Sequence, residues 1–233
     1  MEKTTLLCFP FAGGNRYSYR KYEENAPPFL EIVTMEYPGR GSRYHEPLRF
    51  DMQSLVDDLY IRIRDRIRQG NYAFYGHSMG GLVGFLLARK IEANKEPAPR
   101  HLFVTGSNSP SSGSDDIKRH LLTKDEFIEE LRRLKGCPDE VLDDTGLIEH
   151  YEPIIRADFK ASEEFVYKRS QPLGIPITVI TGTREKMKTE EVRLWQTETT
   201  AAVDFRLLPG DHFFISKYYN IIIEIIVKKI FKN

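Results

Sequence analysis

The sequence is poor in cysteine, and its two cysteines, Cys8 and Cys137, lie far apart in a chain of 233 residues. They form neither a C-x-x-C pair nor a disulfide framework, as is usual for proteins of a reducing cytosol. We therefore expect a cytoplasmic protein in which neither thiol is catalytic. The six histidines are scattered, and the sequence has no H-E-x-x-H motif, no Cys/His cluster and no Gly-rich phosphate loop. We therefore expect no resident metal or cofactor.

An excess of charge of one sign is also missing, because 34 Lys and Arg residues balance 34 Asp and Glu residues. No global field attracts nucleic acid or an acidic membrane, so we expect neither as a partner. Long apolar runs are missing too. In the terminal segment YYNIIIEIIVKKIFKN, Glu224, Lys228 and Lys229 interrupt the run before the ~20 apolar residues that a membrane span needs. This segment indicates a core helix, and the lack of a sustained heptad favours a monomer.

The sequence does contain a repeated order of short apolar runs, turn residues and helical patterns. The runs are mostly continuous rather than alternating, which is typical of strands covered on both faces. We therefore predict one α/β domain over residues 1–233, with a mostly parallel central sheet and flanking helices. The predicted strands are 4–10, 31–38, 72–77, 101–107, 177–182 and 203–210; the predicted helices are 51–69 with Asp51 as N-cap, 79–93, 188–199 and about 216–231.

Residues 111–170 interrupt this alternation. They contain the helical pattern TKDEFIEELRRL, the turn-rich GCPDEVLDD and a second helical run that ends in IRADFKASEEFVYK. Two ordinary crossover helices are one explanation. About 60 residues exceed what one crossover normally needs, so we favour a helical lid insertion over a pocket.

The stretch YGHSMGG places Ser78 between a predicted strand and a predicted helix. Gly76, Ser78 and Gly80 match G-x-S-x-G, which resembles the nucleophile elbow of the α/β-hydrolases, where a sharp strand-to-helix turn presents the serine Oγ. A coincidental turn is the alternative. The flanking strand and helix favour a nucleophile, and the helix N-terminus favours developing negative charge.

A serine hydroxyl needs a base, because it is barely nucleophilic at neutral pH. In this fold the chain order is Ser, acid, His, so the base lies late in the sequence. His212 in LLPGDHFF follows the last predicted strand, and we identify it as the base rather than as a surface-loop histidine. We expect His77, next to the serine, to point away from it and to pack within the elbow.

The acid that orients the base is predicted less directly. It follows the preceding strand, where ITVITGTREK offers Glu185. Glu190 or Glu191 is the alternative, in which case Glu185 is an exposed carboxylate. We reject Asp211, because a residue adjacent to His212 in sequence is poorly placed to reach that ring's nitrogen. The strand that ends in TGSNSP carries no acid.

An oxyanion hole needs two backbone N–H groups, one of them from the residue after the nucleophile, which here is Met79. The second comes from the loop after an early strand. CFPFAGG fits that loop, with Ala12 the preferred donor and Phe11 the next. Gly13 and Gly14 allow main chain to approach a substrate closely, and a simple turn is the alternative explanation of this pair.

Six blocks in this order resemble the type II thioesterases, the stand-alone editing enzymes of nonribosomal peptide and polyketide synthesis. The blocks spread over nearly the whole chain, and they are CFPFAGGN, YPGRGSR, YGHSMGG, LRRLKGCPDEVL, IRADFKASEEF and PGDHFF. The resemblance implies an α/β-hydrolase with a helical lid.

The resemblance further implies hydrolysis of stalled or misprimed acyl groups held as thioesters on the phosphopantetheine arm of an acyl or peptidyl carrier protein. The partner carries that arm, so no cofactor belongs to this chain. Ser78 would take the acyl group, His212 would move the proton, and Met79 and Ala12 would bind the oxyanion. The family usually has Asp where this sequence has Glu185, and Asp158 in RADF remains an outside candidate for the acid, otherwise a lid or pocket residue.

Aromatic residues flank the proposed oxyanion loop and base, and Phe11, Tyr17 and Phe213 are candidates to line an acyl pocket, although core packing explains each equally well. A basic group at Arg16, Arg20 and Lys21 would suit an acidic carrier protein, but a solvated surface explains it too. Two other functions stay open. One is a carboxylesterase of the same fold that acts on small esters, and the other is a non-catalytic interaction module.

Overall fold

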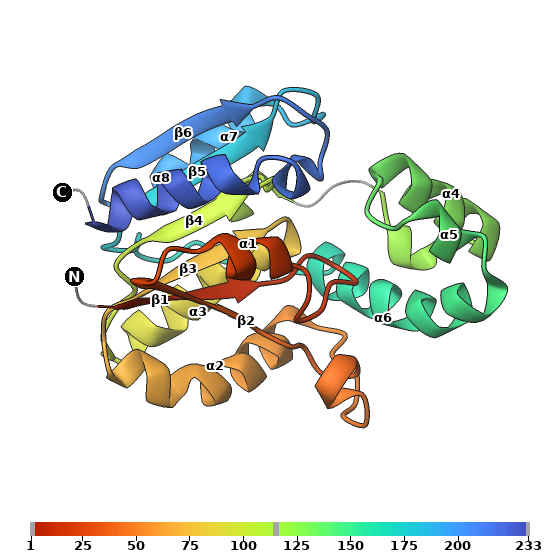
Figure 1. Cartoon of the computed structure of the whole chain (residues 1–233), viewed down its shortest axis with the longest axis horizontal. Helices are drawn as coiled ribbons and strands as arrows, with labels where there is room; N and C mark the ends of the chain where they lie inside the picture. Colours follow the sequence, from red (N-terminus) through yellow and green to blue (C-terminus); the bar gives the residue numbers. More distant parts are fainter. Residues whose placement is uncertain (1–2, 114–116, 232–233) are drawn as a thin grey trace.

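Six strands form one parallel sheet in the computed structural model, which describes residues 3–113 and 117–231. Across the sheet the order is β2-β1-β3-β4-β5-β6, and every neighbouring pair is parallel (Figure 1). The predicted parallel sheet is confirmed. The strands are β1 (Thr4–Phe9), β2 (Leu30–Thr34), β3 (Tyr72–His77), β4 (Leu102–Thr105), β5 (Ile177–Gly182) and β6 (Val203–Leu208).

The second strand is shorter than predicted. It ends at Thr34 rather than at residue 38, and Thr34 is also its last residue in register with β1, opposite Cys8. β2 lies at the edge of the sheet with β1 as its one neighbour, and β1 turns away at Pro10, which has no N–H to continue the ladder. The remaining residues of the predicted strand therefore form a loop.

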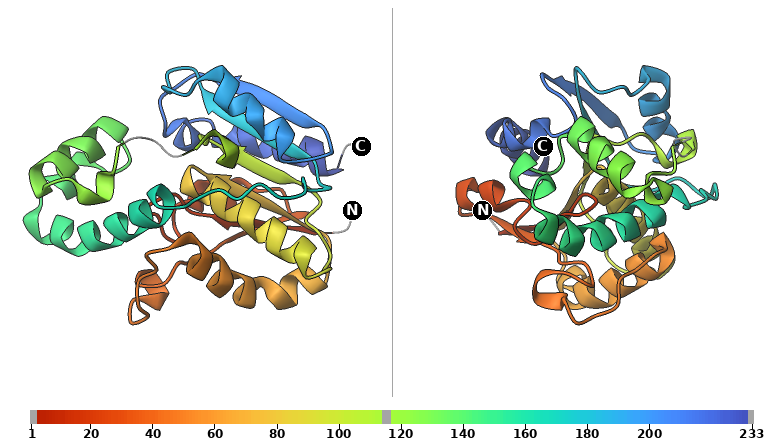
Figure 2. Two further views of the ribbon diagram at one scale, coloured as in Figure 1. Left: turned by 180° about the vertical axis from the view of Figure 1, so that it is seen from behind. Right: turned by 90° about the vertical axis from the view of Figure 1, so that its right-hand side faces the viewer.

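Helices cover both faces of the sheet (Figure 2). The side chains of β1 show the two layers: Leu7 and Phe9 belong to one buried cluster, and Leu6 and Cys8 belong to the other. The first layer contains α2 (Met52–Arg68), α3 (Met79–Ala93) and α7 (Thr189–Arg193), and the second contains α1 (Arg20–Asn25) and α8 (Tyr219–Phe231). Asp51 caps α2 as predicted, since its side chain accepts from Ser54 N. The six-residue α1 was not predicted, because Tyr22 alone is buried in it.

Between β4 and β5 the chain forms α4 (Lys124–Leu134), α5 (Asp139–Leu142) and α6 (Thr145–Glu163). These helices share a small core of their own, to which Phe127, Leu131 and Ile148 contribute. Figure 1 shows α4 and α5 apart from the sheet, beyond the arrowheads of the strands, and α6 running back towards the sheet. We refer to the sheet and the helices that cover its two faces as the body. We refer to α4, α5 and α6 together as the helical insertion. Within the described residues, no helix is long and apolar enough to cross a membrane.

Candidate active site

Ser78 occupies a strained turn between β3 and α3. Its φ of 55° and ψ of −122° lie in a region that non-glycine residues rarely adopt, and its amide donates to Thr105 O at 2.8 Å. The neighbouring glycines are required by close packing: a Cβ on Gly76 would lie 2.0 Å from Gly80 O, and one on Gly80 would lie 2.0 Å from Phe9 O. The G-x-S-x-G pattern therefore forms the strand-to-helix elbow that the sequence predicts.

His212 and Glu185 form a hydrogen-bonded pair, with 2.6 Å between His212 Nδ1 and Glu185 Oε1. Glu185 is 3% exposed and follows β5, whereas His212 is 25% exposed and follows β6. The other carboxylate oxygen, Oε2, accepts from Gly182 N at 2.5 Å. A carboxylate fixed in this way holds the imidazole in one orientation and leaves Nε2 for chemistry.

The other carboxylates weighed as the acid have different partners. Glu190 is exposed, and Glu191 accepts from Lys188 and Asn108. Asp158 binds Arg40, and Asp211 binds Arg184 and Lys135. Among the described residues, none of these four carboxylates forms a hydrogen bond or ion pair with His212. Attraction to Arg184, and after it Lys135, lowers the pKa of Asp211 to about 2.

His77 is buried beside the pair formed by His212 and Glu185. Its ring centroid lies 4.7 Å from that of His212, and its Nδ1 lies 3.0 Å from Thr105 Oγ1. Burial, and after it the neighbouring His212, holds the pKa of His77 well below its usual value, so the ring is neutral. Gly106, with φ of +58°, makes room for it, since a Cβ there would lie 2.5 Å from His77 Cε1.

Ser78 and His212 lie at the same end of the sheet, where its parallel strands have their carboxyl ends. Ser78 directly follows β3, and His212 lies in the loop after β6. Ser78 Oγ makes no hydrogen bond to another described residue. Hydrogen bonds between nucleophile and base are commonly long in the absence of substrate and tighten when it binds.

Two backbone amides are available near Ser78. Met79 is the first residue of α3, so its N–H has no acceptor inside the helix. Ala12 occupies the second position of a turn that Gly14 N closes onto Phe11 O at 2.8 Å. Gly13, at the third position, has φ of +77°, while Ala12 has negative φ, which is the geometry of a type II turn. Gly80 packs on Phe9 O and brings this loop next to the elbow.

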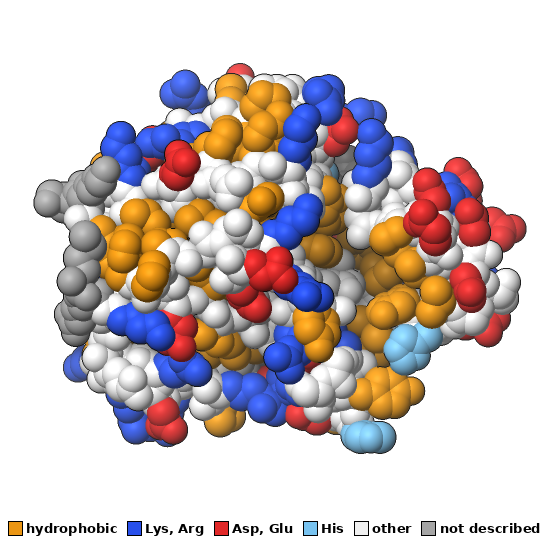
Figure 3. All heavy atoms as spheres, in the orientation of Figure 1, with side chains coloured by type: hydrophobic (Ala, Val, Ile, Leu, Met, Phe, Trp, Pro, Cys, Tyr) orange, Lys and Arg blue, Asp and Glu red, His pale blue; other side chains and the backbone are white. Residues whose placement is uncertain are grey.

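Two of the three aromatic residues predicted for the pocket come together. The rings of Phe11 and Phe213 meet edge to face with centroids 4.9 Å apart, and both also contact His77. Tyr17 does not join them: it is 63% exposed, and the Arg16 guanidinium lies over its ring. Figure 3 shows a hollow between the body and the helical insertion where hydrophobic side chains gather.

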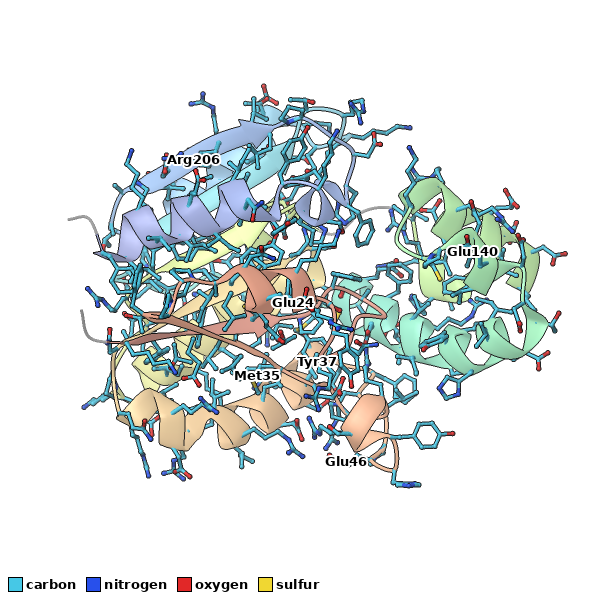
Figure 4. All side chains as sticks on the ribbon, in the orientation of Figure 1. Glu24, Met35, Tyr37, Glu46, Glu140 and Arg206 are labelled. Carbon is cyan, nitrogen blue, oxygen red and sulfur yellow. The ribbon has the colours of Figure 1, made fainter. Side chains whose placement is uncertain are left out.

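The helical insertion touches the loop that carries His212. Lys135 Nζ, after α4, lies 3.0 Å from Asp211 Oδ2, and a Cβ on Gly136 would lie 2.8 Å from the Phe213 ring. The residues of the predicted basic group each have a separate partner. Arg20 pairs with Glu24, which is labelled in Figure 4, and the Lys21 ammonium lies over the Tyr219 ring. No cluster of His, Cys, Asp or Glu in the described part of the chain is arranged to hold a metal.

A parallel sheet with helices on both faces, an elbow serine after a central strand and a His–carboxylate pair after the last two strands define the α/β-hydrolase class. The chain belongs to the thioesterase domain family, whose model matches residues 4–231. It is 35% identical to the gramicidin S biosynthesis protein GrsT of Aneurinibacillus migulanus over 93% of this chain and 85% of that protein.

Solved structures agree with this assignment. The RedJ thioesterase of the prodiginine pathway in Streptomyces coelicolor is 29% identical with a TM-score of 0.92, over 98% of this chain and 91% of that one. The type II thioesterase BorB from the borrelidin biosynthetic cluster is 30% identical with a TM-score of 0.90, over 98% and 93%. The chain is therefore a thioesterase, and the resemblance to the type II thioesterases is confirmed.

Two features of the site were not predicted from the sequence. One is Gly106, whose only signal was a glycine directly after a strand in TGSNSP. The other is the pairing of Arg40 in PGRG with Asp158 in RADF, which also bind Gly14 O and Gly13 N; a contact across 118 residues leaves no local signal.

Proposed function

We propose that this thioesterase removes acyl groups from the phosphopantetheine thioester of acyl or peptidyl carrier proteins in nonribosomal peptide or polyketide synthesis. Relatives named for gramicidin S biosynthesis, the prodiginine pathway and the borrelidin cluster support this class of substrate. The observation that carries the reaction is the pair formed by His212 and Glu185 at the sheet edge where the strained Ser78 lies. In this proposal the phosphopantetheine arm belongs to the carrier protein, and the thioesterase contributes amino-acid residues only.

In the first half-reaction, Ser78 Oγ attacks the thioester carbonyl while His212 Nε2 takes the hydroxyl proton. Glu185 holds the ring by Nδ1 and stabilises the imidazolium that forms. The amides of Ala12 and Met79 donate to the oxyanion. The C–S bond then breaks, and the pantetheine thiol leaves with the proton returned by His212.

In the second half-reaction, His212 removes a proton from water, which attacks the acyl-serine. The tetrahedral oxyanion forms at the same two amides, and the C–O bond to Ser78 breaks with the proton returned to Oγ. The acyl group leaves as a free acid. Phe11 and Phe213 border the acyl chain in this proposal.

We further propose that the helical insertion is a lid for this site. Its contacts with Asp211 and Phe213 support that role, because these two residues flank His212. The pair that joins the insertion to this loop, Lys135 with Asp211, is exposed, so it separates readily when a long pantetheine arm enters.

The test compares release of acetyl from acetyl-phosphopantetheinyl carrier protein with hydrolysis of p-nitrophenyl acetate. The enzyme and Ser78→Ala are both measured. We expect release from the carrier protein that depends on Ser78 and strongly exceeds turnover of the oxygen ester. Brisk turnover of the ester without release from the carrier would instead identify a carboxylesterase.

A further inference from the structure

Arg40 and Asp158 form a buried, two-pronged ion pair. Arg40 Nη1 lies 2.5 Å from Asp158 Oδ2, and Arg40 Nη2 lies 2.7 Å from Asp158 Oδ1. The two side chains are 5% and 3% exposed. Burial alone would lower the pKa of Arg40, but the Asp158 carboxylate outweighs it and raises that pKa, so the guanidinium remains charged. The pair joins the loop after β2 to α6 of the helical insertion.

Both members of the pair also bind the backbone of the turn at Ala12. Asp158 Oδ2 accepts from Gly13 N at 2.8 Å, and Arg40 Nη1 donates to Gly14 O at 3.2 Å. These bonds fix the Ala12–Gly13 and Gly14–Asn15 peptide groups, which lie on the C-terminal side of Ala12. The turn is therefore bound by a donor, Arg40, and an acceptor, Asp158, which also form an ion pair with each other.

Two further contacts fix the same turn. Tyr37, labelled in Figure 4, donates from its hydroxyl to Pro10 O at 2.8 Å, and the Arg40 guanidinium lies over its ring. Ile155, three residues before Asp158 on α6, packs so closely that a Cβ on Gly13 would lie 2.7 Å from Ile155 Cγ1. The loop after β2 and the helical insertion thus meet at the turn.

We propose that Arg40 and Asp158 are positioning residues that set the direction of the Ala12 amide for the oxyanion. The proposal rests on the proposed function. A fixed orientation of the Ala12 N–H matters because an oxyanion donor acts over a narrow range of distance and angle. Loss of one such donor lowers kcat about 10²–10³-fold. Asp158 therefore acts through the turn, while Glu185 serves His212.

The test uses Asp158→Asn, which retains an oxygen for Gly13 N–H but removes the charge that binds Arg40. We expect kcat for the acetyl thioester of pantetheine to fall about 10- to 100-fold, because the donor is misdirected rather than removed. KM stays within about threefold. An alkylboronic acid, which forms a tetrahedral adduct with the Ser78 oxygen, loses affinity by the same factor as kcat. The pH midpoint of kcat/KM does not move, since His212 keeps Glu185.

Glu163→Gln is the matched control. Glu163 is a buried carboxylate of the same helix, and it binds His120 rather than the turn. We expect this variant to alter the melting temperature without changing the boronate affinity. If Asp158→Asn does not fold, the double change Arg40→Met with Asp158→Leu removes both charges and leaves neither uncompensated. That variant is expected to fold and to show the same losses.

Three results would overturn the proposal. They are normal kcat with a lowered melting temperature, a shifted pH midpoint, and lost kcat with unchanged boronate affinity. Boronate affinity is measured by calorimetry and needs no turnover. A wild-type enzyme without thioester hydrolysis would therefore refute the proposed function and still leave the effect of Asp158 on the turn measurable.

Discussion

The carboxylate of Glu185 bridges His212 Nδ1, at 2.6 Å from Oε1, and the amide of Gly182, at 2.5 Å from Oε2. Glu185 also donates its own amide to Gly182 O at 3.2 Å. The backbone therefore turns sharply after β5 and folds the longer side chain of Glu back over the end of the strand. The extra methylene is accommodated by this turn, and the carboxylate still reaches the imidazole.

Glu185→Gln is expected to lower kcat roughly 10²–10⁴-fold, because an amide in place of the carboxylate no longer stabilises the imidazolium and can select the wrong tautomer. The measurement is kcat for the acetyl thioester of pantetheine. Glu190→Gln is the control. Glu190 lies three residues after Met187, on the first turn of α7, and its side chain is exposed, so this variant should retain normal kcat. Equal losses in both variants would contradict the assignment.

Ala12→Pro is expected to lower kcat about 10²–10³-fold by removing one oxyanion donor. Proline suits the second position of a type II turn, so the turn itself is retained. Ala12→Gly keeps the N–H and should stay within a few-fold of the wild type. The account fails at this point if the proline variant is as active as the glycine variant.

Gly80→Ala is expected to destabilise the protein, although alanine is the better helix former. Its Cβ would lie 2.0 Å from Phe9 O, a backbone atom in the central sheet that cannot move aside. Overpacking of this kind typically costs about 1–3 kcal/mol or more. Gly84→Ala, also in α3, meets side-chain atoms at 3.2 Å or beyond and should cost less. Urea unfolding of the two variants measures the difference.

The free energy of unfolding is expected to fall as pH decreases from about 6.5 towards 4. Burial, and after it Lys229, lowers the pKa of His101 to about 4, and burial lowers that of His77 as well. Unfolded histidine titrates near 6.5, so in this window the unfolded chain binds protons that the folded chain does not. Stability therefore rises with pH, by up to about 1.4 kcal/mol per pH unit for each histidine.

His101→Gln tests this pH dependence, because glutamine keeps a polar group near Thr178 Oγ1, which lies 2.8 Å from His101 Nε2. The slope of unfolding free energy against pH should decrease by the contribution of one group. Identical slopes for the variant and the wild type between pH 6.5 and 4.5 would contradict the lowered pKa of His101.

The positions of Ser78, His212 and Glu185 after β3, β6 and β5 could be predicted because each residue follows a strand signal in the sequence. Ser78 needed only the strand before it and the helix after it, and Glu185 needed the end of β5. The end of β2 was misplaced, because it depends on Pro10, which follows the neighbouring strand β1. The pairing of Arg40 with Asp158 was not predicted, since it depends on how the helical insertion returns to the body.

His77 shows the same limit at a single residue. Its position beside Ser78 predicted packing within the elbow, and burial there is confirmed. Its contact with the His212 ring follows from the meeting of β3 with the loop after β6, which are far apart in sequence. Local patterns therefore predicted which residues the ends of the strands bring together, and long-range packing determined the residues that surround them.

The most direct test of the account is mass spectrometry of peptides from the enzyme, after it is mixed rapidly with acetyl-phosphopantetheinyl carrier protein and quenched in acid. We expect one acetyl group on the peptide that contains Ser78, formed and lost at rates consistent with turnover, and none in Ser78→Ala. Hydrolysis of the thioester at an unchanged rate in Ser78→Ala, or an acetyl group on a different residue, would contradict the central role of Ser78.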